Sequence, residues 1–453
     1  MAPLAVPAPR AEQPAPRPRT RAPQPPAPAN GLTLAEAEAR LVERNLAVIA
    51  AQRGVDAARA QRLVASSLPP PSVSVGNTFG QYNEGPNTGT RDIRGLSPSN
   101  NINAGLTVLV ELGGKRTLRT RLAEGNIGVA EAQVLDTLRQ QIFALRQAFI
   151  AALAARANYE VAASNRQSLD RTEALLRRQL QDGALPEGDL LRFQAARLPF
   201  EAEVTTAAQN YAAAAAQLAV ALAADAAALP APRPGLPAVA LEPRGTLPQR
   251  ADPGVSRGEL LDAVRNRPDV VAAQRQAAAA TTNTELAQAS QWRDVTANAG
   301  WGRTRLSQNL PSGARELDAN NQFTFNLSVP IFTNRIVQGN IGVAQGQQAQ
   351  AEALARAALL QARADFATAW SALEQARALS RLFSEGGALN RAELAYRSTE
   401  QAYLAGGRSL LEVLDALRTL NATRVAANNA RAGVLLALAQ LEAATGVGGL
   451  MPR

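Results

Sequence analysis

The chain has 453 residues, of which 46% are hydrophobic but only 4% aromatic, and a formal net charge of +9 at pH 7. It contains no cysteine and no histidine, which excludes a disulfide framework, a thiolate or imidazole metal site and any histidine-based catalytic triad. No apolar run is long enough for a transmembrane helix, and the arginines are dispersed among Glu and Asp, which does not favour nucleic-acid binding.

The first half of the chain predicts two short strands between helices. Residues 1–31, rich in Pro, Ala and Arg, predict a disordered tail that lacks the apolar region of a secretory signal. Thr33, with Glu36 three residues later, predicts a helix start. The elements expected are a helix from about 32 to 65, a strand at 73–82, a loop at 85–100, a strand at 101–112, a long helix at 116–182, a break at Gly183 and Pro186, and a returning helix at 188–228.

After a segment containing many prolines, the second half predicts the same order again. The elements expected are a helix at 257–291 with a break at Pro268, a strand at 295–305, a polar loop at 306–321, a strand at 322–332, a long helix at 335–405, a turn at Gly406-Gly407 and a helix at 408–445.

The two halves also share short stretches of sequence. Ala50-Ala-Gln-Arg53 matches Ala272-Ala-Gln-Arg275, a spacing of 222, and Asp189-Leu-Leu191 corresponds to Ser409-Leu-Leu411, a spacing of 220. An internal duplication follows. We therefore divide the chain into a tail (1–31), a first structural repeat (32–228), a Pro-rich linker (229–255), a second structural repeat (256–446) and a C-terminal tail (447–453).

The predicted strands have one apolar and one polar face. In 322–332, Phe323, Phe325 and Leu327 alternate with Thr324 and Asn326. Strands of about ten residues suit a transmembrane barrel, but four cannot close one, and open edges are not tolerated in lipid. Either several copies share a barrel, or the strands form a small water-soluble sheet on a helical stalk. Periodicity alone leaves both open.

Several stretches, together spanning essentially residues 32–446, resemble the TolC family of outer-membrane efflux channels. They are Leu34–Gln52 with Asn45-Leu-Ala-Val48, Asn266-Arg-Pro-Asp-Val270, Val329-Pro-Ile-Phe332 and, most specific, the helical-hairpin tip Tyr403–Ala416. Glu111-Leu-Gly-Gly-Lys-Arg116 looks most like the cobalt–zinc–cadmium, or heavy-metal, branch of the family.

The resemblance implies a mainly α fold with a small β part. Duplicated long-helix hairpins and four strands per chain would form a homotrimeric 12-stranded barrel in outer-membrane lipid, on an α-helical tunnel that extends into the periplasm. Its implied partners are a periplasmic adaptor protein and an inner-membrane pump of the resistance-nodulation-division type.

The resemblance also implies two groups of functional residues near the helix turns. The candidates for a gate at the tunnel entrance are Asp189, Tyr403, Arg408, Glu412 and Asp415. The candidates for adaptor docking are Gly183, Gly406, Gly407, Ser409, Leu410 and Leu411. We expect Arg408 to bind the Asp189 carboxylate, Glu412 and Asp415 to form acidic rings in a trimer, and the glycines to adopt positive φ. The alternative is that Asp189 and Ser409 only cap helices.

The sequence therefore predicts passage rather than catalysis: an outer-membrane exit duct of a tripartite efflux system, with no enzyme activity, cofactor, metal site or nucleic-acid partner. A soluble coiled-coil scaffold and a type I secretion outer-membrane channel are the alternatives. The scaffold would leave the four alternating strands without a purpose, whereas the secretion channel would differ only in its cargo.

Overall fold

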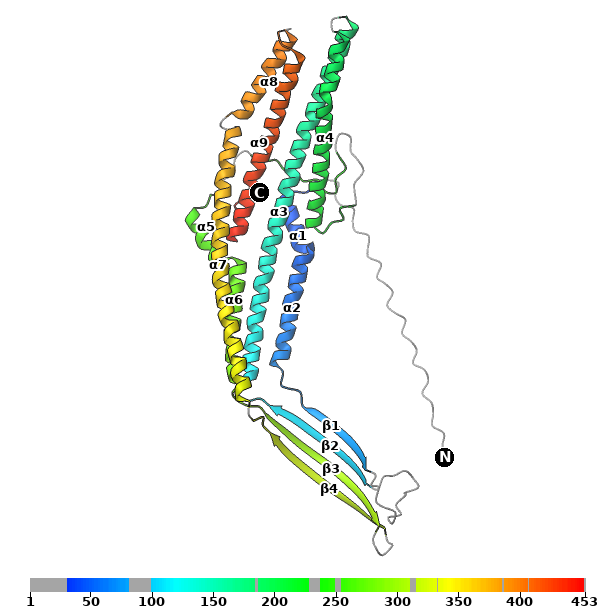
Figure 1. Cartoon of the computed structure of the whole chain (residues 1–453), viewed down its shortest axis with the longest axis vertical. Helices are drawn as coiled ribbons and strands as arrows, with labels where there is room; N and C mark the ends of the chain where they lie inside the picture. The colour runs from blue at the N-terminus through cyan, green and yellow to red at the C-terminus, as the bar shows by residue number, and fades with distance from the viewer. Residues whose placement is uncertain are drawn as a thin grey trace, which may run out of the picture.

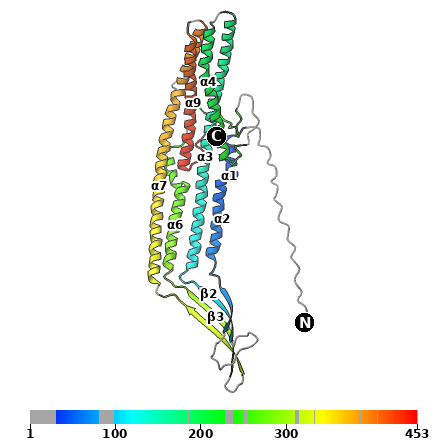
Figure 2. The ribbon, with the colours of Figure 1, turned by 45° about the vertical axis from the view of Figure 1, so that its right-hand side comes forward.

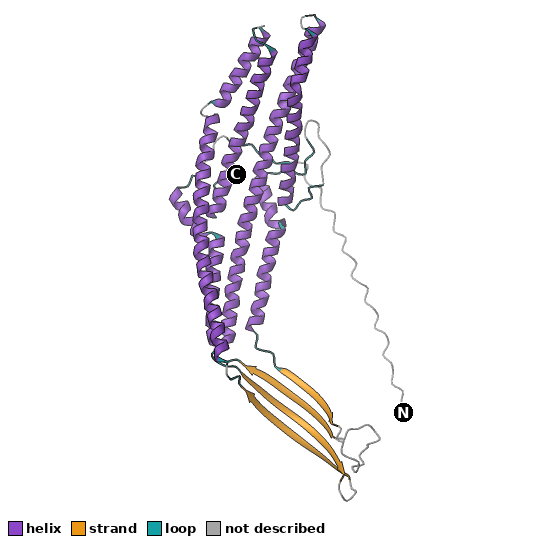
Figure 3. Cartoon of the chain, in the orientation of Figure 1, coloured by secondary structure: helices purple, strands orange, loops and turns teal. Residues whose placement is uncertain are grey.

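A computed structural model describes residues 31–80, 99–183, 186–227, 237–248, 254–309, 315–331, 333–384, 387–405 and 407–451. Over these residues the molecule is elongated, with a body of long helices that carries a curved four-stranded sheet at one end (Figures 1 and 3). Residues 1–30 of the predicted tail, and nearly all of the loop predicted at 85–100, lie outside the described residues.

The first repeat is organised around helix α3 (Lys115–Gln181), whose 67 residues extend about 100 Å at 1.5 Å per residue. Helix α4 (Glu187–Ala221) folds back on one half of α3, and α1 (Leu34–Arg44) and α2 (Leu46–Ser66) lie along it nearer the sheet. The predicted capping box is confirmed, because Thr33 and Glu36 exchange hydrogen bonds of 3.0 and 3.4 Å. The single helix predicted for 32–65 is wrong, since the side chain of Asn45 starts a new helix by accepting from two backbone N–H groups.

The second repeat follows the same order. It contains α5 (Arg257–Ala263), a 3-10 turn η1 (Val264–Asn266), α6 (Pro268–Ala289), α7 (Asn334–Ser384), α8 (Ala388–Leu404) and α9 (Leu410–Thr445). Pro268 opens α6 at the break that the sequence predicted. The continuous helix predicted for 335–405 is wrong. It divides before α8, where Gly387 has φ 64°, a left-handed conformation that a continuing helix does not allow.

The four strands form one antiparallel sheet in the order β1-β2-β3-β4. They are β1 (Ser72–Gly80), β2 (Ser99–Val110), β3 (Val295–Asn309) and β4 (Arg315–Ser328). The loop predicted for 306–321 is wrong, because β3 and β4 stay paired as far as Asn309 and Arg315. This part of the hairpin is rich in polar residues and lacks a clear alternation of apolar and polar residues, so the periodicity did not predict it. Its backbone groups nevertheless continue the hydrogen bonds between β3 and β4.

The helices form a layer whose members change between the two halves of the molecule, and Figure 2 shows this layer in the half near the sheet. In the half near the sheet, neighbouring helices run α2–α3–α6–α7. In the half near the hairpin tips, α4 takes the place of α2 beside α3, and α9 takes the place of α6 between α3 and α7. Two pairs of shorter helices therefore continue each other, while α3 passes through both halves.

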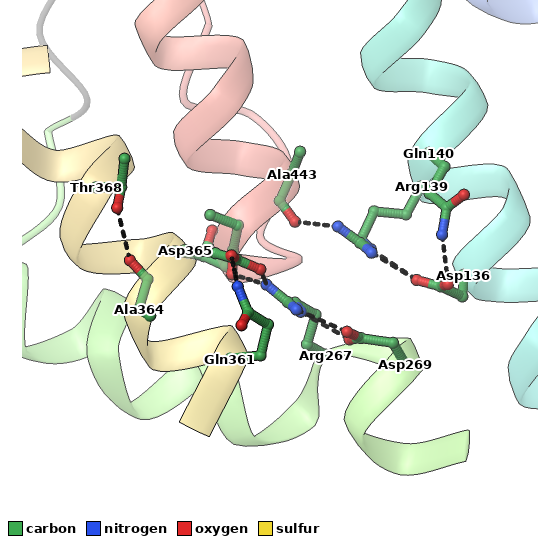
Figure 4. A network of polar contacts seen from close by, with 12 residues as sticks. Asp136, Arg139, Gln140, Arg267, Asp269, Gln361, Ala364, Asp365, Thr368 and Ala443 are labelled. Atoms are coloured by element: carbon green, nitrogen blue, oxygen red, sulfur yellow. Dashed lines mark hydrogen bonds and ion pairs between the residues drawn. The ribbon is translucent and has the colours of Figure 1, made fainter. Parts of the chain in front are cut away.

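Both places where one helix takes over from another are held by a polar side chain. At the first, Asn45 Nδ2 donates to the Ala221 carbonyl oxygen at the end of α4, at 3.4 Å. At the second, Arg267 is 3% exposed and donates to the Ala444 carbonyl oxygen near the end of α9, at 3.3 Å. Figure 4 shows the Arg267 guanidinium between the carboxylates of Asp269 and Asp365, at 2.6 and 2.9 Å. These bonds explain why the chain carries Asn45 and Arg267 in the two stretches quoted above.

The core combines many alanines with leucines, valines and a few aromatic residues. Alanines at 362, 369, 437 and 439 are almost completely buried, which lets neighbouring helices approach closely. Beyond α9, the chain turns back at Gly446, which has φ 74°. Leu450 and Met451 are then buried, and their backbone N–H groups donate to the Glu442 carboxylate.

Candidate functional site at the hairpin tips

The first hairpin tip joins α3 to α4. Asp182 ends α3, and Gly183 follows with φ 72°, the left-handed conformation that the sequence predicted. Pro186 precedes the first residue of α4 in an extended conformation. Asp189 lies in the first turn of α4, where a carboxylate interacts favourably with the helix dipole, but it is not the capping residue. Asp189 thus remains available for another role.

The second tip joins α8 to α9. Ser409 caps α9 through a complete capping box, because its hydroxyl accepts from the Glu412 N–H while the Glu412 carboxylate accepts from the Ser409 N–H. Gly406 lies outside the described residues. Gly407 does not have the positive φ that we expected. Its N–H instead closes the turn on the Ala402 carbonyl oxygen at 2.8 Å.

The two tips share one apolar cluster. Its buried members come from α3, α4 and α9: Leu169, Leu176, Leu190, Phe193, Phe200, Leu414 and Leu417. Tyr396, Tyr403 and Leu410 are partly buried and pack against this cluster. In the corresponding pairs Leu190-Leu191 and Leu410-Leu411, the first leucine packs against this cluster. The second is exposed, by 57% at Leu191 and 70% at Leu411. Of the predicted docking leucines, Leu411 is thus on the surface, and Leu410 is partly buried against the tip cluster. Leu191 was missed, although the spacing of 220 pointed to it.

The structure brings Tyr403, rather than Arg408, to Asp189. Burial and the negative charge of Asp189 both raise the pKa of the Tyr403 hydroxyl. Within the chain, Asp189 pairs with Arg192 on its own helix at 3.5 Å. Arg408 does not reach Asp189, because the capping box brings the Glu412 carboxylate within 3.2 Å of its guanidinium. The expected Arg408–Asp189 bond is therefore absent within one chain.

The predicted acidic pair also divides in two. The Glu412 carboxylate accepts hydrogen bonds from the Ser409 N–H and from the Arg408 guanidinium. Asp415, about one turn further along α9, is exposed. Exposed pairs such as Arg408–Glu412 stabilise a protein by about 0–1 kcal/mol. The charged groups at the tips are thus loosely held and can exchange partners.

A stronger cluster braces the first hairpin below its tip. Arg197 of α4 pairs with Asp170 and Glu173 of α3 and with Glu201 of its own helix. The hydrogen bond from Gln194, with further help from Arg197, lowers the pKa of Glu173. Sequence reasoning missed this cluster, because its members lie on two antiparallel helices whose register only the structure supplies.

At the other end of the molecule, the strand register separates the two faces of the sheet. Val75, Ala104, Trp301 and Phe323 lie side by side on one face, which is apolar. The opposite face carries mainly hydroxyl, amide and glycine residues, and the register adds Glu316 and Asp318 near the end remote from the helices. On this face Asn298 Nδ2 donates to Thr107 Oγ1 at 2.8 Å. Phe323, Phe325 and Leu327 are each more than two-thirds exposed. An exposed apolar face on a four-stranded sheet, with no other element packed on it, indicates a surface that contacts lipid or another protein.

The turn between β2 and α3 ties the two repeats together. Gly113 and Gly114 have φ 75° and 69°, and a side-chain carbon on Gly113 would lie 2.8 Å from Trp292. Lys115, the sole lysine found in the sequence, binds Asp294 at 2.7 Å. The glycines and the lysine of Glu111–Arg116 therefore let this turn of the first repeat pack against the residues that precede β3 in the second repeat.

Among the described residues, no helix combines the length and the hydropathy needed to span a membrane. The same residues contain no group of three or more His, Cys, Asp or Glu side chains that could hold a metal ion.

One protein family matches part of the chain by sequence. The sequence profile of the outer membrane efflux protein family matches residues 260–447. The match therefore covers most of the second half of the chain. No curated protein matches the chain by sequence.

Solved outer-membrane channels share the fold over nearly the whole chain. CusC is 18% identical, with a TM-score of 0.69 and 92% of each chain covered. The open state of the Neisseria gonorrhoeae MtrE outer membrane channel is 21% identical, with a TM-score of 0.64 and coverage of 92% of this chain and 89% of that one. VceC from Vibrio cholerae is 19% identical, with a TM-score of 0.67 and coverage of 92% and 96%.

The resemblance to TolC-family channels is thus confirmed, and so is the mainly α fold with a small sheet. An outer membrane efflux protein with this fold is located in the outer membrane, and its helices extend into the periplasm. The family is one of transport channels rather than enzymes.

Proposed function

We propose that three copies of this outer membrane efflux protein form one duct, the exit of a tripartite system that also contains a periplasmic adaptor and an inner-membrane pump of the resistance-nodulation-division type. The sheet carries the proposal. It has an uncovered apolar face and a polar face, and its outer strands β1 and β4 each pair on one side only within the described chain. Open edges do not persist in lipid, so another copy has to pair with them.

Geometry sets the number of copies. With strands about 4.8 Å apart and tilted by about 40°, twelve strands enclose a barrel about 24 Å across, whereas four would enclose about 9 Å. Eight strands already give an interior that side chains fill, so the sheet of one chain cannot close on itself. The glycines of the polar face suit the concave inner wall: a side-chain carbon on Gly76 would lie 2.7 Å from Asn103.

The helical layer has open edges on the same two sides. In the half near the sheet, α2 and α7 each have one neighbour in the layer, and both display apolar side chains to solvent: Leu46, Leu63 and Val64 on α2, and Ile336, Val343, Leu354 and Leu360 on α7. A ring in which α2 of one copy packs on α7 of the next would cover them all. The same ring would join β1 to β4.

The tips supply the proposed working parts. Leu191 and Leu411 are exposed at equivalent places in the two hairpins, which favours docking of an adaptor that contacts both. The polar groups Asp189, Tyr403, Arg408, Glu412 and Asp415 gather around the same turns, and in a trimer they would repeat three times around the entrance. Weak exposed pairs suit a gate, because an adaptor can rearrange them at little cost in free energy.

The resemblance of the Glu111–Arg116 turn to the heavy-metal branch supports metal efflux as the role of the system. A type I secretion role would require the same duct with another pump. The soluble scaffold offers no use for the apolar face of the sheet.

Cysteine cross-linking tests the assembly, because the chain has no cysteine of its own. Ser74 of β1 and Asn326 of β4 lie on the polar face at the two edges of the sheet. Ser74→Cys combined with cysteines at successive polar-face positions of β4, beginning with Asn326→Cys, should give covalent trimers in outer-membrane fractions for at least one pair. Each single variant serves as its control and should give none. Recovery of a soluble monomer without cross-links would reject the proposal.

A further inference from the structure

Two arginines follow the apolar stretch of β3. On the apolar face this strand presents Val295, Ala297, Ala299 and Trp301 in turn, and then Arg303 and Arg305. Trp301, Arg303 and Arg305 are all exposed. An aromatic residue followed by cations on the same face is the arrangement expected where hydrocarbon gives way to lipid headgroups.

Nothing in the described part of the sheet neutralises these two charges. Across the ladder, Arg303 lies between Ile102 and Asn321, and Ala319 lies opposite Arg305. Neither arginine forms an ion pair with another described residue, and no strand position on this face is occupied by Asp or Glu. The cations are therefore available to an anion from outside the chain.

A neighbouring copy cannot supply that anion. β3 pairs with β2 on one side and β4 on the other, so it is an inner strand of the sheet. Copies joined edge to edge through β1 and β4 would leave the outward face of β3 in contact with the membrane.

The two arginines also lie at a defined depth. The ends of β3 and β4 joined by their hairpin are remote from the helices (Figure 1), and the helices are periplasmic, so this end of the sheet faces the cell exterior. At about 3.3 Å per residue and a tilt of about 40°, Arg303 and Arg305 lie about 5 and 10 Å outward of Trp301. Their flexible stems can follow the acyl boundary while the guanidinium groups reach the phosphate level.

We propose that Arg303 and Arg305 form a binding site for the phosphate groups of lipid A, the anionic glycolipid of the outer leaflet. Guanidinium groups bind phosphate oxygens through paired charge-assisted hydrogen bonds, and the apolar face below them accepts the acyl chains. The site rests on the proposed trimeric barrel, and it fixes the height and orientation of that barrel in the membrane.

Native mass spectrometry of detergent-purified trimers tests the site, with bisphosphorylated lipid A as the probe. The variant Arg303→Gln with Arg305→Gln removes both charges. The matched control, Arg293→Gln with Arg335→Gln, removes two positive charges at the helix end of the same strands. A cation near an anionic lipid surface strengthens binding about fivefold, so the first variant should bind about 25-fold more weakly. The control should bind like the unaltered protein, and Arg303→Lys with Arg305→Lys should retain most of the binding.

Two further measurements separate the possible failures. Binding should weaken with added salt and with monophosphorylated lipid A, because each removes part of the phosphate attraction. Trimers that form normally but bind lipid A equally well with and without the two arginines would overturn the lipid site and leave the duct intact. An equal loss in the control would overturn it as well. Failure of the unaltered chain to form trimers would reject the duct, and the lipid site with it.

Discussion

Phe325 offers a sharp test of membrane insertion, since the register places it near the middle of the apolar face. It pairs with Ala299, which lies between Val295, near the helices, and Trp301, at the outer boundary. Phe325 is 80% exposed in the single chain. An arginine at the bilayer midplane of a barrel costs about 2–4 kcal/mol, so Phe325→Arg should cost about 6–12 kcal/mol in a barrel built from three copies.

The matched control is the adjacent residue, Thr324, which lies on the polar face opposite Gly300. Thr324→Arg places the same charge in the water-filled interior, where the glycine leaves room for it. We expect Phe325→Arg to deplete heat-sensitive trimers from outer-membrane fractions and to prevent folding into lipid vesicles, while Thr324→Arg does neither. Equal tolerance of both changes, or greater damage from Thr324→Arg, would refute the assignment of the two faces.

Three predictions concern the tips. Leu411→Asp should abolish efflux-dependent resistance in a susceptibility assay, because it disrupts the proposed docking surface; trimers on immunoblots should persist, and their loss would instead make Leu411 a core residue. Arg408→Ser with Tyr403→Phe should raise single-channel conductance in planar bilayers, by removing groups that narrow the entrance; unchanged conductance would place the gate elsewhere. Glu412→Ala with Asp415→Ala should lower cation preference, measured from reversal potentials in a salt gradient. Because Glu412 also caps α9, Asp415→Ala alone should show part of this change, and unaltered selectivity would mean that both carboxylates are only solvated surface.

Local signals in the sequence predicted the order of elements well. Thr33 and Glu36 marked a true helix start, Pro268 marked a true break, and alternation found all four strands. These signals succeed because they depend on residues close together in the chain. The break before α8 was missed, although Glu385-Gly-Gly387 stands in the sequence, because glycine only permits a left-handed turn and does not require one.

The candidate site was less predictable, because its contacts join separate hairpins. The sequence indicated that Leu410 and Leu411 are apolar neighbours, but only the packing of the tip cluster shows that Leu410 is partly buried and Leu411 is exposed. The sequence also placed Tyr403 and Arg408 near Asp189, because both flank the Gly406-Gly407 turn, but the capping box directs Glu412 to Arg408 first. Arg267 lay within a quoted stretch, yet its partner Asp365 is 98 residues away.

The division between α7 and α8 makes the two hairpins mechanically unequal. The first hairpin has an unbroken strut, α3, braced to α4 by the Arg197 cluster. The outer strut of the second hairpin is jointed at Gly387, and α8 beyond this joint packs mainly on α9. A force applied at the tips would therefore bend the second hairpin before the first. In a threefold ring, three stiff first hairpins and three jointed second hairpins would alternate around the entrance. The entrance could then widen by outward rotation of the three jointed hairpins while the three stiff ones stay in place.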